Sequence, residues 1–196
     1  MLKLRMIYEK TGNMKYLGHL DVVRIFTRAA KRSGLPFWIT EGFNPHIYLN
    51  FTMPLPLGVA GAREICDFKF TGPAVNIPDR LNEYLPERLK VLSVEEPGID
   101  AADAAFSCFE FAFPDVGKEE LTGFFEKNGI IALKKNKPVD IRPLFEGVDM
   151  TGGVLTLKFS NLSPTLFLSA LFEHLDRRVF YTCRRTGLFT ADGRLI

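Results

Sequence analysis

The side chains best suited to chemistry in this sequence gather between residues 10 and 58. Two of the three histidines lie there, and an imidazole titrates near neutral pH, so each can transfer a proton or donate to a phosphate. Carboxylate, amide and cationic groups accompany them. We expect one concave ligand site formed by Lys10, His19, Asp21, Arg24, Asn44 and His46.

A helix that begins at His19 offers a purely structural explanation of Asp21. Gly18 can cap that helix, which would place Asp21 in the first turn, beside unpaired backbone N–H groups and the positive end of the dipole. Arg24 follows one turn later and can pair with the carboxylate. In the alternative, residues 12–21 form a loop that cradles a ligand, with His19 at its edge. The sequence leaves both explanations open.

The segment Gly-Phe-Asn-Pro at residues 42–45 indicates a turn that leads into a strand. By alternation, the strand that follows shares one face among His46, Tyr48, Asn50 and Thr52. If it lies in one sheet with the N-terminal strand, that face also carries two cations. Cations for phosphates and flat rings for bases suit RNA. The candidate RNA platform is therefore Lys3, Arg5, Tyr48 and Asn50, unless the second half of the chain covers this face.

The motifs of metal and cofactor chemistry are missing from the sequence. There is no CxxC, CxxxCxxC or HxxxH pattern, no glycine-rich phosphate loop and no nucleophile elbow. We expect no metal and no cofactor. The second half offers one weaker pair, Asp140 and Arg142, which would point to the same side of a short strand. A structural ion pair and a second candidate site both explain that pattern.

The hydrophobic periodicity predicts alternating strands and helices in two similar halves. Strands are expected over residues 2–8, 37–40, 46–53, 66–70, 89–94, 109–113, 130–134, 139–141, 155–159 and 179–184. Helices are expected over residues 19–33, 77–85, 118–128 and 163–178. The fold class that follows is α+β, with tandem ferredoxin-like (split β-α-β) halves, antiparallel sheets and an extra strand in each half. The expected halves are residues 1–96 and 106–196, joined by a linker at 97–105.

Composition and charge limit the cellular location and the kinds of partner that we expect for the protein. No apolar run reaches the roughly 18–20 residues that span a bilayer, and the three cysteines are far apart. We expect a cytoplasmic protein that does not contact a membrane. Residues 1–52 carry eight Lys and Arg against three Asp and Glu, residues 53–130 seven against fourteen, and residues 131–196 ten against six. Two basic parts therefore flank an acidic middle, which either suits a phosphate-bearing partner or reflects ordinary solvated faces.

The order of these motifs resembles the bacterial radical-SAM-linked proteins, a domain of unknown function found fused to or encoded beside radical-SAM enzymes. The shared features are Lys-Thr-Gly at residues 10–12, His-Leu-Asp at 19–21, Arg24, Gly-Phe-Asn-Pro-His at 42–46 and Pro-Leu-Pro-Leu-Gly at 54–58. Gly18 departs from the pattern, because a serine is usual there. Residues 139–143 and 185–188 look like later landmarks of the family. The resemblance implies a bacterial cytoplasmic protein that works with a radical-SAM enzyme, with RNA as a candidate substrate.

Two functions remain from different classes. The first is a non-catalytic accessory module that binds RNA or a partner protein and works with a separate radical-SAM enzyme in RNA modification. The second is a metal-independent ribonuclease that uses His19 and His46, an arrangement that looks like the CRISPR RNA-processing endonucleases. The glycine-rich C-terminal loop of those enzymes is not evident here. Cleavage of RNA in EDTA is expected only for the second function.

Overall fold

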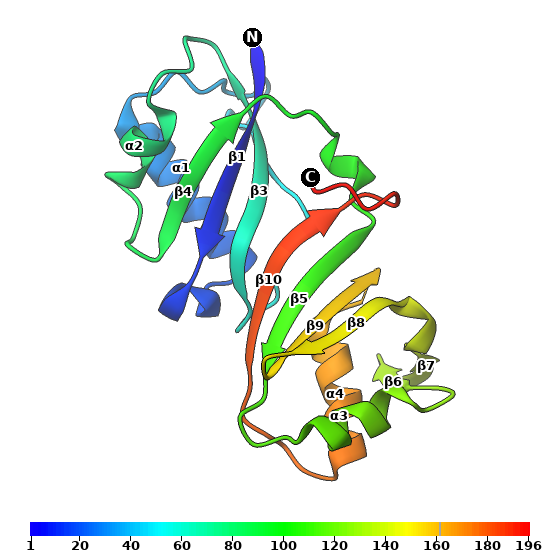
Figure 1. Ribbon diagram of the computed structural model, residues 1–196. Coiled ribbons are helices and arrows are strands. Elements are labelled where there is room, and N and C mark those ends of the chain that lie inside the picture. The colour runs from blue at the N-terminus through cyan, green and yellow to red at the C-terminus, as the bar shows by residue number, and fades with distance from the viewer. Residues whose placement is uncertain (161) are drawn as a thin grey trace. The chain divides into compact units, whose positions relative to one another are not determined.

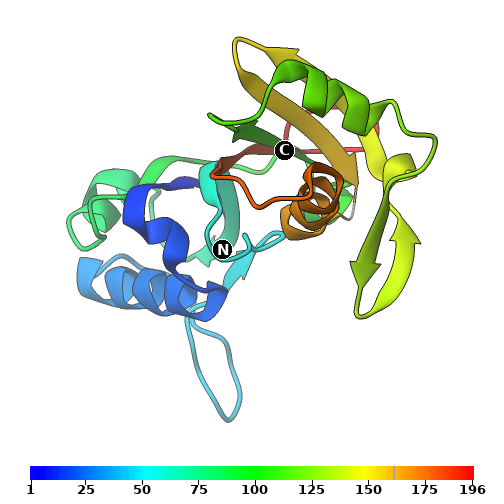
Figure 2. The ribbon, with the colours of Figure 1, turned by 90° about the horizontal axis from the view of Figure 1, so that it is seen from below.

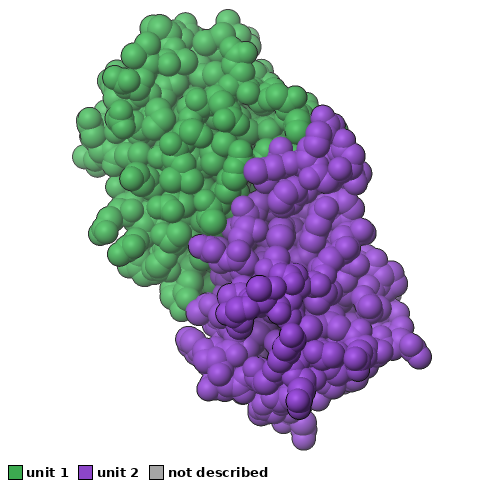
Figure 3. All heavy atoms as spheres, viewed as in Figure 1, with its two compact units in different colours: residues 1–103, 196 green, residues 104–195 purple. Residues whose placement is uncertain are grey.

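The computed structural model describes residues 1–160 and 162–196 of the chain, and it divides into two compact units. Unit 1 comprises Met1–Asp103 together with Ile196, and unit 2 comprises Ala104–Leu195 (Figure 3). Both units combine helices with antiparallel strands, so the molecule belongs to the mixed α and β class. The boundary between Asp103 and Ala104 falls within the segment expected as a linker.

Unit 1 contains four strands and two α-helices among its described residues (Figure 1). In chain order they are β1 (Leu2–Lys10), α1 (His19–Ser33), β2 (Leu49–Phe51), β3 (Ala60–Phe70), α2 (Ile77–Asn82) and β4 (Leu89–Glu95). The strand order is β4-β1-β3-β2, and each neighbouring pair is antiparallel. A short 3-10 helix, η1 (Gly12–Tyr16), connects β1 with α1.

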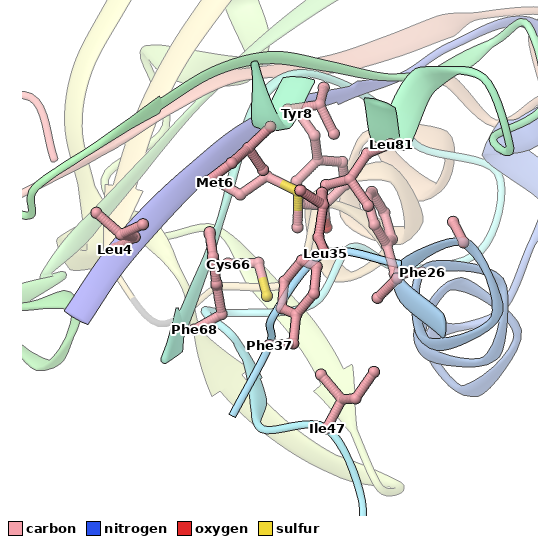
Figure 4. Packing of buried hydrophobic residues seen from close by; sticks show 14 of the residues in the cluster. Leu4, Met6, Tyr8, Phe26, Leu35, Phe37, Ile47, Cys66, Phe68 and Leu81 are labelled. Carbon is pink, nitrogen blue, oxygen red and sulfur yellow. The ribbon is translucent and has the colours of Figure 1, made fainter. Parts of the chain in front are cut away.

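Helix α1 has the bounds that the sequence predicts. It ends because Gly34 adopts the left-handed conformation, at φ 63°, which a glycine reaches without a steric penalty. Its buried side, around Phe26, packs with α2 and with alternate side chains of the strands, including Met6 and Phe68 (Figure 4). Both helices therefore cover the same face of the unit 1 sheet, and α1 presents its polar side to solvent.

Unit 2 repeats the strand and helix order and adds a hairpin. Its main elements are β5 (Phe106–Ala112), α3 (Lys118–Phe125), β8 (Phe145–Thr151), β9 (Val154–Ser160), α4 (Pro164–Leu175) and β10 (Thr182–Phe189). The strand order is β10-β5-β9-β8, again antiparallel. Strands β6 (Ile131–Lys134) and β7 (Lys137–Asp140) pair with each other in a separate two-stranded sheet.

Phenylalanines make up much of the core of unit 2. Phe167 of α4 lies 4.9 Å from Phe111 of β5 and 5.9 Å from Phe124 of α3, measured between ring centroids. Phe109 stacks on Phe159 at 4.9 Å. Alternate residues of the strands expected at 109–113 and 155–159 are all buried: Phe109, Phe111, Phe113, Leu155, Leu157 and Phe159. The strand phase predicted for this half is thereby confirmed.

Several predicted elements differ from the structure for identifiable reasons. The strand expected at 37–40 is reduced to isolated bridges at Phe37 and Ile39, and the strand expected at 46–53 keeps only its centre, β2. Strand β8 was not predicted, because most of its side chains are exposed and show no apolar alternation. Helix α4 stops at Leu175, before the two arginines expected to end it, since Asp176 is left-handed at φ 51°.

Candidate nucleic-acid interface

Two aromatic rings and two lysines meet at one end of the unit 1 sheet. Lys3 of β1 lies directly opposite Lys69 of β3, so both side chains leave the same face. The Lys69 ammonium lies 4.5 Å from the centre of the Trp38 ring and 5.1 Å from that of Tyr48. The two ring centroids are 6.2 Å apart. Cations and half-buried aromatic rings thus share one patch.

The backbone holds these rings in place. The amide of Trp38 donates to the carbonyl of Lys69 at 2.9 Å, and the amide of Tyr48 donates to the carbonyl of Trp38 at 3.3 Å. Asn50, which is exposed, pairs across β2 and β3 with Asp67, two residues before Lys69. We call the patch formed by Lys3, Trp38, Tyr48, Asn50 and Lys69 the Trp38 surface.

Arg5 does not belong to this exposed patch, which corrects the predicted platform. Its side chain is only 2% exposed, and its guanidinium donates to both oxygens of Asp67, at 2.7 and 3.1 Å. Ile7, on the same strand face, is buried too. A buried and doubly bonded guanidinium cannot reach the phosphates of a ligand, and its removal would disturb the fold. The sequence indicated which residues share this face. It did not show which of the cations on the face are exposed to solvent.

Lys3 stands at the boundary between the buried pair and solvent. Its side chain is 49% exposed, and its ammonium lies 3.7 Å from Asp67 and 3.6 Å from Asp100. The amide of Ala102 donates to the Asp100 carboxylate, and this bond, with the Lys3 charge, lowers the pKa of that carboxyl. A phosphate that approaches Lys3 must therefore compete with Asp100 in solvent, where such an ion pair is weak.

His19 lies at the start of α1, and its ring packs edge to face against Phe51, with 5.8 Å between centroids. A hollow of about 10 Å³ lies beside it, which has room for about one water molecule. Its lining consists of Tyr8, Lys10, His19, Val22, Pro54 and Leu55. Lys10 is buried and donates to the carbonyl of Leu17 at 3.2 Å. No substrate fits this hollow as it stands.

Asp21 and Arg24 form the helix-surface pair that the structural explanation predicts. Their charged atoms are 3.1 Å apart, and the two side chains are 53% and 66% exposed. Asp21 lies in the first turn of α1, where a carboxylate is favoured. A wider hollow of about 720 Å³ lies beside η1 and is lined in part by Gly12 and Arg88, but His19 is not part of its lining. Arg88 is already paired with Glu87 at 3.7 Å.

Asn44 and His46 belong to the exposed loop that precedes β2. The His46 Nδ1 atom lies 3.1 Å from the Thr40 hydroxyl and 2.9 Å from the carbonyl oxygen of Asn44. The His46 amide also donates to the Thr40 hydroxyl at 3.1 Å. These bonds brace a loop whose tip, Phe43, is fully exposed. Figure 2 shows this segment, near residue 43, projecting from the body of unit 1.

The six residues expected to form one site thus make three local sets of contacts in the structure. One set surrounds His19 and Lys10, the second is the Asp21–Arg24 pair, and the third holds Asn44 and His46 in their loop. Within the described part of the chain we find no direct hydrogen bond or ring contact between His19 and His46. Their convergence on one ligand stays a prediction.

In unit 2, Asp140 and Arg142 interact, but not as the ion pair suggested by their spacing. The Asp140 carboxylate accepts from two backbone amides, those of Ile130 and Arg142, each at 2.9 Å. Asp140 therefore closes the base of the β6-β7 hairpin. In both contacts the Asp140 carboxylate binds a backbone amide, not the Arg142 guanidinium. The expected ion pair is therefore not among these contacts, and the carboxylate binds the Arg142 backbone amide in place of its side chain.

Trp38 and Lys69 were missed by sequence reasoning. The chain has one tryptophan, and Lys69 stands between the buried Phe68 and Phe70, so its outward orientation was readable from alternation. What the sequence did not show was the register that places Lys69 opposite Lys3 and next to Trp38. Register depends on pairing across the sheet, which a single strand pattern does not encode.

The described residues contain no group of three or more His, Cys, Asp and Glu side chains that could hold a metal ion. They also contain no helix that is long and apolar enough to cross a membrane.

Comparison with known proteins places the chain in a family. A family model matches residues 3–176, which covers unit 1 almost completely and most of unit 2. The chain belongs to DUF2344, a family of uncharacterised proteins conserved in bacteria. That description names no activity and makes no link to radical-SAM enzymes. No curated protein matches the chain.

Proposed function

We propose that this DUF2344 protein is a non-catalytic accessory module that binds single-stranded RNA on the Trp38 surface. The observation that carries the proposal is the Lys69 ammonium, which lies over the rings of both Trp38 and Tyr48 on the residue directly opposite Lys3. Surfaces that bind single strands without sequence preference combine aromatic rings for the bases with cations for the backbone.

The energetics of such a surface are modest. One base stacked on Trp38 or Tyr48 contributes roughly 1–3 kcal/mol. Lys3 and Lys69 each neutralise a phosphate, and the counterions released make binding weaker as salt rises. Two stacked bases and two phosphate contacts support weak binding. Such affinity suits a module that holds a substrate for another protein.

The fold supports the same proposal. We infer that each unit is ferredoxin-like, so that the chain is a tandem pair of split β-α-β modules with a hairpin added to the second. The support is the β-α-β-β-α-β order and the strand orders β4-β1-β3-β2 and β10-β5-β9-β8. In unit 1 both helices cover one sheet face, and the Trp38 surface lies on the other. RNA-binding sheets of this plan place their aromatic residues on the face without helices.

The resemblance to radical-SAM-linked proteins suggests the partner. We propose that the protein presents RNA to a separate radical-SAM enzyme, which would carry the chemistry. The support is the series of motifs from residues 10–12 to residues 54–58 described above. Pull-down of a purified radical-SAM enzyme encoded beside this chain, with and without RNA, tests this part. Absence of any complex in both conditions would refute it.

The RNA-binding part is tested with a fluorescein-labelled oligouridine followed by anisotropy at several salt concentrations. Tyr48→Ala is expected to weaken binding by roughly 1–3 kcal/mol through lost stacking. Tyr16→Ala is the matched control, because Tyr16 likewise has a lysine, Lys15, over its ring at 5.1 Å and is itself exposed. RNA should also quench the fluorescence of Trp38, the single tryptophan.

Three results would count against this function. Absence of binding at low salt would reject it, and so would equal effects of the Tyr48 and Tyr16 substitutions. Cleavage of the RNA in EDTA, lost in His19→Ala or His46→Ala, would replace it with the ribonuclease. The separate contacts of the two histidines do not favour that alternative.

A further inference from the structure

The β6-β7 hairpin is an addition to the repeated strand and helix order of unit 2. Its two strands pair antiparallel from Ile131 opposite Asp140 to Lys134 opposite Lys137. The turn residues Lys135 and Asn136 both have positive φ, at 52° and 62°, as a two-residue hairpin turn requires. Figure 2 shows the hairpin extending away from the rest of unit 2.

The tip of this hairpin is strongly basic. Lys134, Lys135 and Lys137 are all exposed, and residues 127–142 contain five Lys and Arg against one acid, Asp140. That acid already accepts two backbone amides at the base of the hairpin. The lysines at the tip therefore have no acidic side chain from the hairpin to neutralise them.

Two of these lysines lie directly opposite each other on the two strands, which destabilises the hairpin. Lys134 and Lys137 are direct cross-strand partners, and like charges in that position destabilise a strand pair. A bound polyanion would remove the repulsion. Stability of the hairpin alone does not explain the arrangement, whereas binding of an anionic ligand does.

We infer that the β6-β7 hairpin is a basic arm that binds the sugar–phosphate backbone of RNA. The inference rests on the proposed function in one respect, namely that RNA is the ligand, but it names a second surface on another unit. Lys134, Lys135 and Lys137 each provide an ammonium group for a phosphate oxygen. Ile131 and Leu133, which are 53% and 61% exposed, lie on the face of the same strand opposite Lys134, so the contacts to the phosphates come from the lysines alone.

The side-chain chemistry favours a nucleic-acid backbone over an acidic protein. Lysine is depleted from the cores of protein–protein interfaces, where aromatic residues and arginine provide most of the binding energy. The hairpin carries three lysines and no aromatic residue. Backbone binding requires only such point charges and no particular base sequence.

The test uses the full chain and a labelled single-stranded oligouridine, titrated at 50 and 200 mM salt. Each phosphate contact changes the slope of log K against log salt by about −0.7, so removal of one contact reduces the loss of affinity over this range by about 2.6-fold. Lys134→Glu should produce at least that reduction, and Lys134→Arg should restore wild-type behaviour. Lys118→Glu is the matched control, because it makes the same charge change on an exposed residue of unit 2 outside the hairpin.

The stability of the variant separates binding from folding. Lys134→Glu places opposite charges across the strand pair, so its melting temperature should equal or exceed that of the wild type. Weaker RNA binding by a protein of equal or greater stability then supports the arm. Equal affinities and slopes for Lys134→Glu, Lys118→Glu and the wild type would overturn it.

The same titration distinguishes the arm from the Trp38 surface. If Tyr48→Ala weakens binding and Lys134→Glu does not, the proposed function stands and the arm is wrong. If only Lys134→Glu weakens binding, the arm stands and the Trp38 surface is wrong. If the wild type does not bind RNA at 50 mM salt, both are wrong. Displacement of RNA by poly-glutamate at equal charge would overturn the choice of RNA in favour of an acidic protein.

Discussion

The ion pair between Arg5 and Asp67 gives the sharpest prediction about the fold of unit 1. Both side chains are 2% exposed, and the guanidinium bonds both carboxylate oxygens. Arg5→Met fills much of the same space but leaves the Asp67 carboxylate buried without its main partner. Loss of one member of a buried pair costs about 3–5 kcal/mol, because the remaining charge stays desolvated. We expect a loss of this size in the free energy of unfolding.

Lys3 reduces the loss of stability expected for Arg5→Met, and its own substitution provides the control. Its ammonium lies 3.7 Å from Asp67, so it compensates part of the charge that Arg5→Met leaves behind. Lys3 is half-exposed, and exposed pairs contribute about 0–1 kcal/mol. Lys3→Met should therefore change the free energy of unfolding by no more than about 1 kcal/mol. The double variant Arg5→Met/Asp67→Leu removes both buried charges and should recover most of the stability lost in Arg5→Met.

Urea denaturation followed by tryptophan fluorescence measures these differences in unit 1, because the single tryptophan, Trp38, lies there. With a urea slope of about 2 kcal/mol per molar, a loss of 4 kcal/mol moves the midpoint down by about 2 M. A midpoint shift below about 0.5 M for Arg5→Met would refute the reasoning. So would a double variant less stable than Arg5→Met, since the penalty would then not come from an uncompensated Asp67.

Two further predictions concern groups whose pKa the structure shifts. Burial raises the pKa of the Cys66 thiol and raises that of Cys183 to about 12, so a thiol reagent at pH 8 should modify the half-buried Cys108 first; simultaneous modification of all three would contradict this. Glu120 accepts the Gly117 amide and pairs with Arg177, which lowers its pKa. Its contribution to stability is therefore present above the pKa of the unfolded chain and is lost as the pH falls through the folded value. The difference in melting temperature between the wild type and Glu120→Gln should therefore shrink as the pH falls below the usual glutamate pKa of about 4.3; a difference that grows as the pH falls would disprove this.

Local signals in the sequence predicted most of the elements. The apolar side of residues 19–33 and the stop at Gly34 gave the first helix its observed bounds. The alternation of Phe109, Phe111 and Phe113 identified the inner face of β5. These signals succeed because each depends on neighbours within one helix or strand. Strand β8 is not predicted by such signals, because it is mostly exposed and its sequence shows no apolar alternation.

The candidate interface was harder to predict, because it depends on pairing between strands. Alternation put Lys3 and Arg5 on one polar face, and that face exists. It did not reveal that Asp67 lies opposite Arg5 while Lys69 lies opposite Lys3. The first pairing buries a cation in an ion pair, and the second leaves two cations beside aromatic rings. A register shift of two residues in one direction would place Asp67 opposite Lys3 and the apolar Ile65 opposite Arg5.

The contrast between these neighbouring rows shows how one sheet face can combine a stabilising ion pair with the proposed RNA-binding residues. In the row of Arg5, Asp67 and Asn50, opposite charges meet across adjacent strands and need no external partner. In the next row, Lys3 and Lys69 are like charges opposite each other, which destabilises the pair unless something neutralises them. Lys3 turns to Asp67 and Asp100, and Lys69 turns to the aromatic rings. The same like-charge arrangement recurs at Lys134 and Lys137. At both places, an anionic ligand would relieve the repulsion between the two lysines, which is why both are proposed to bind RNA.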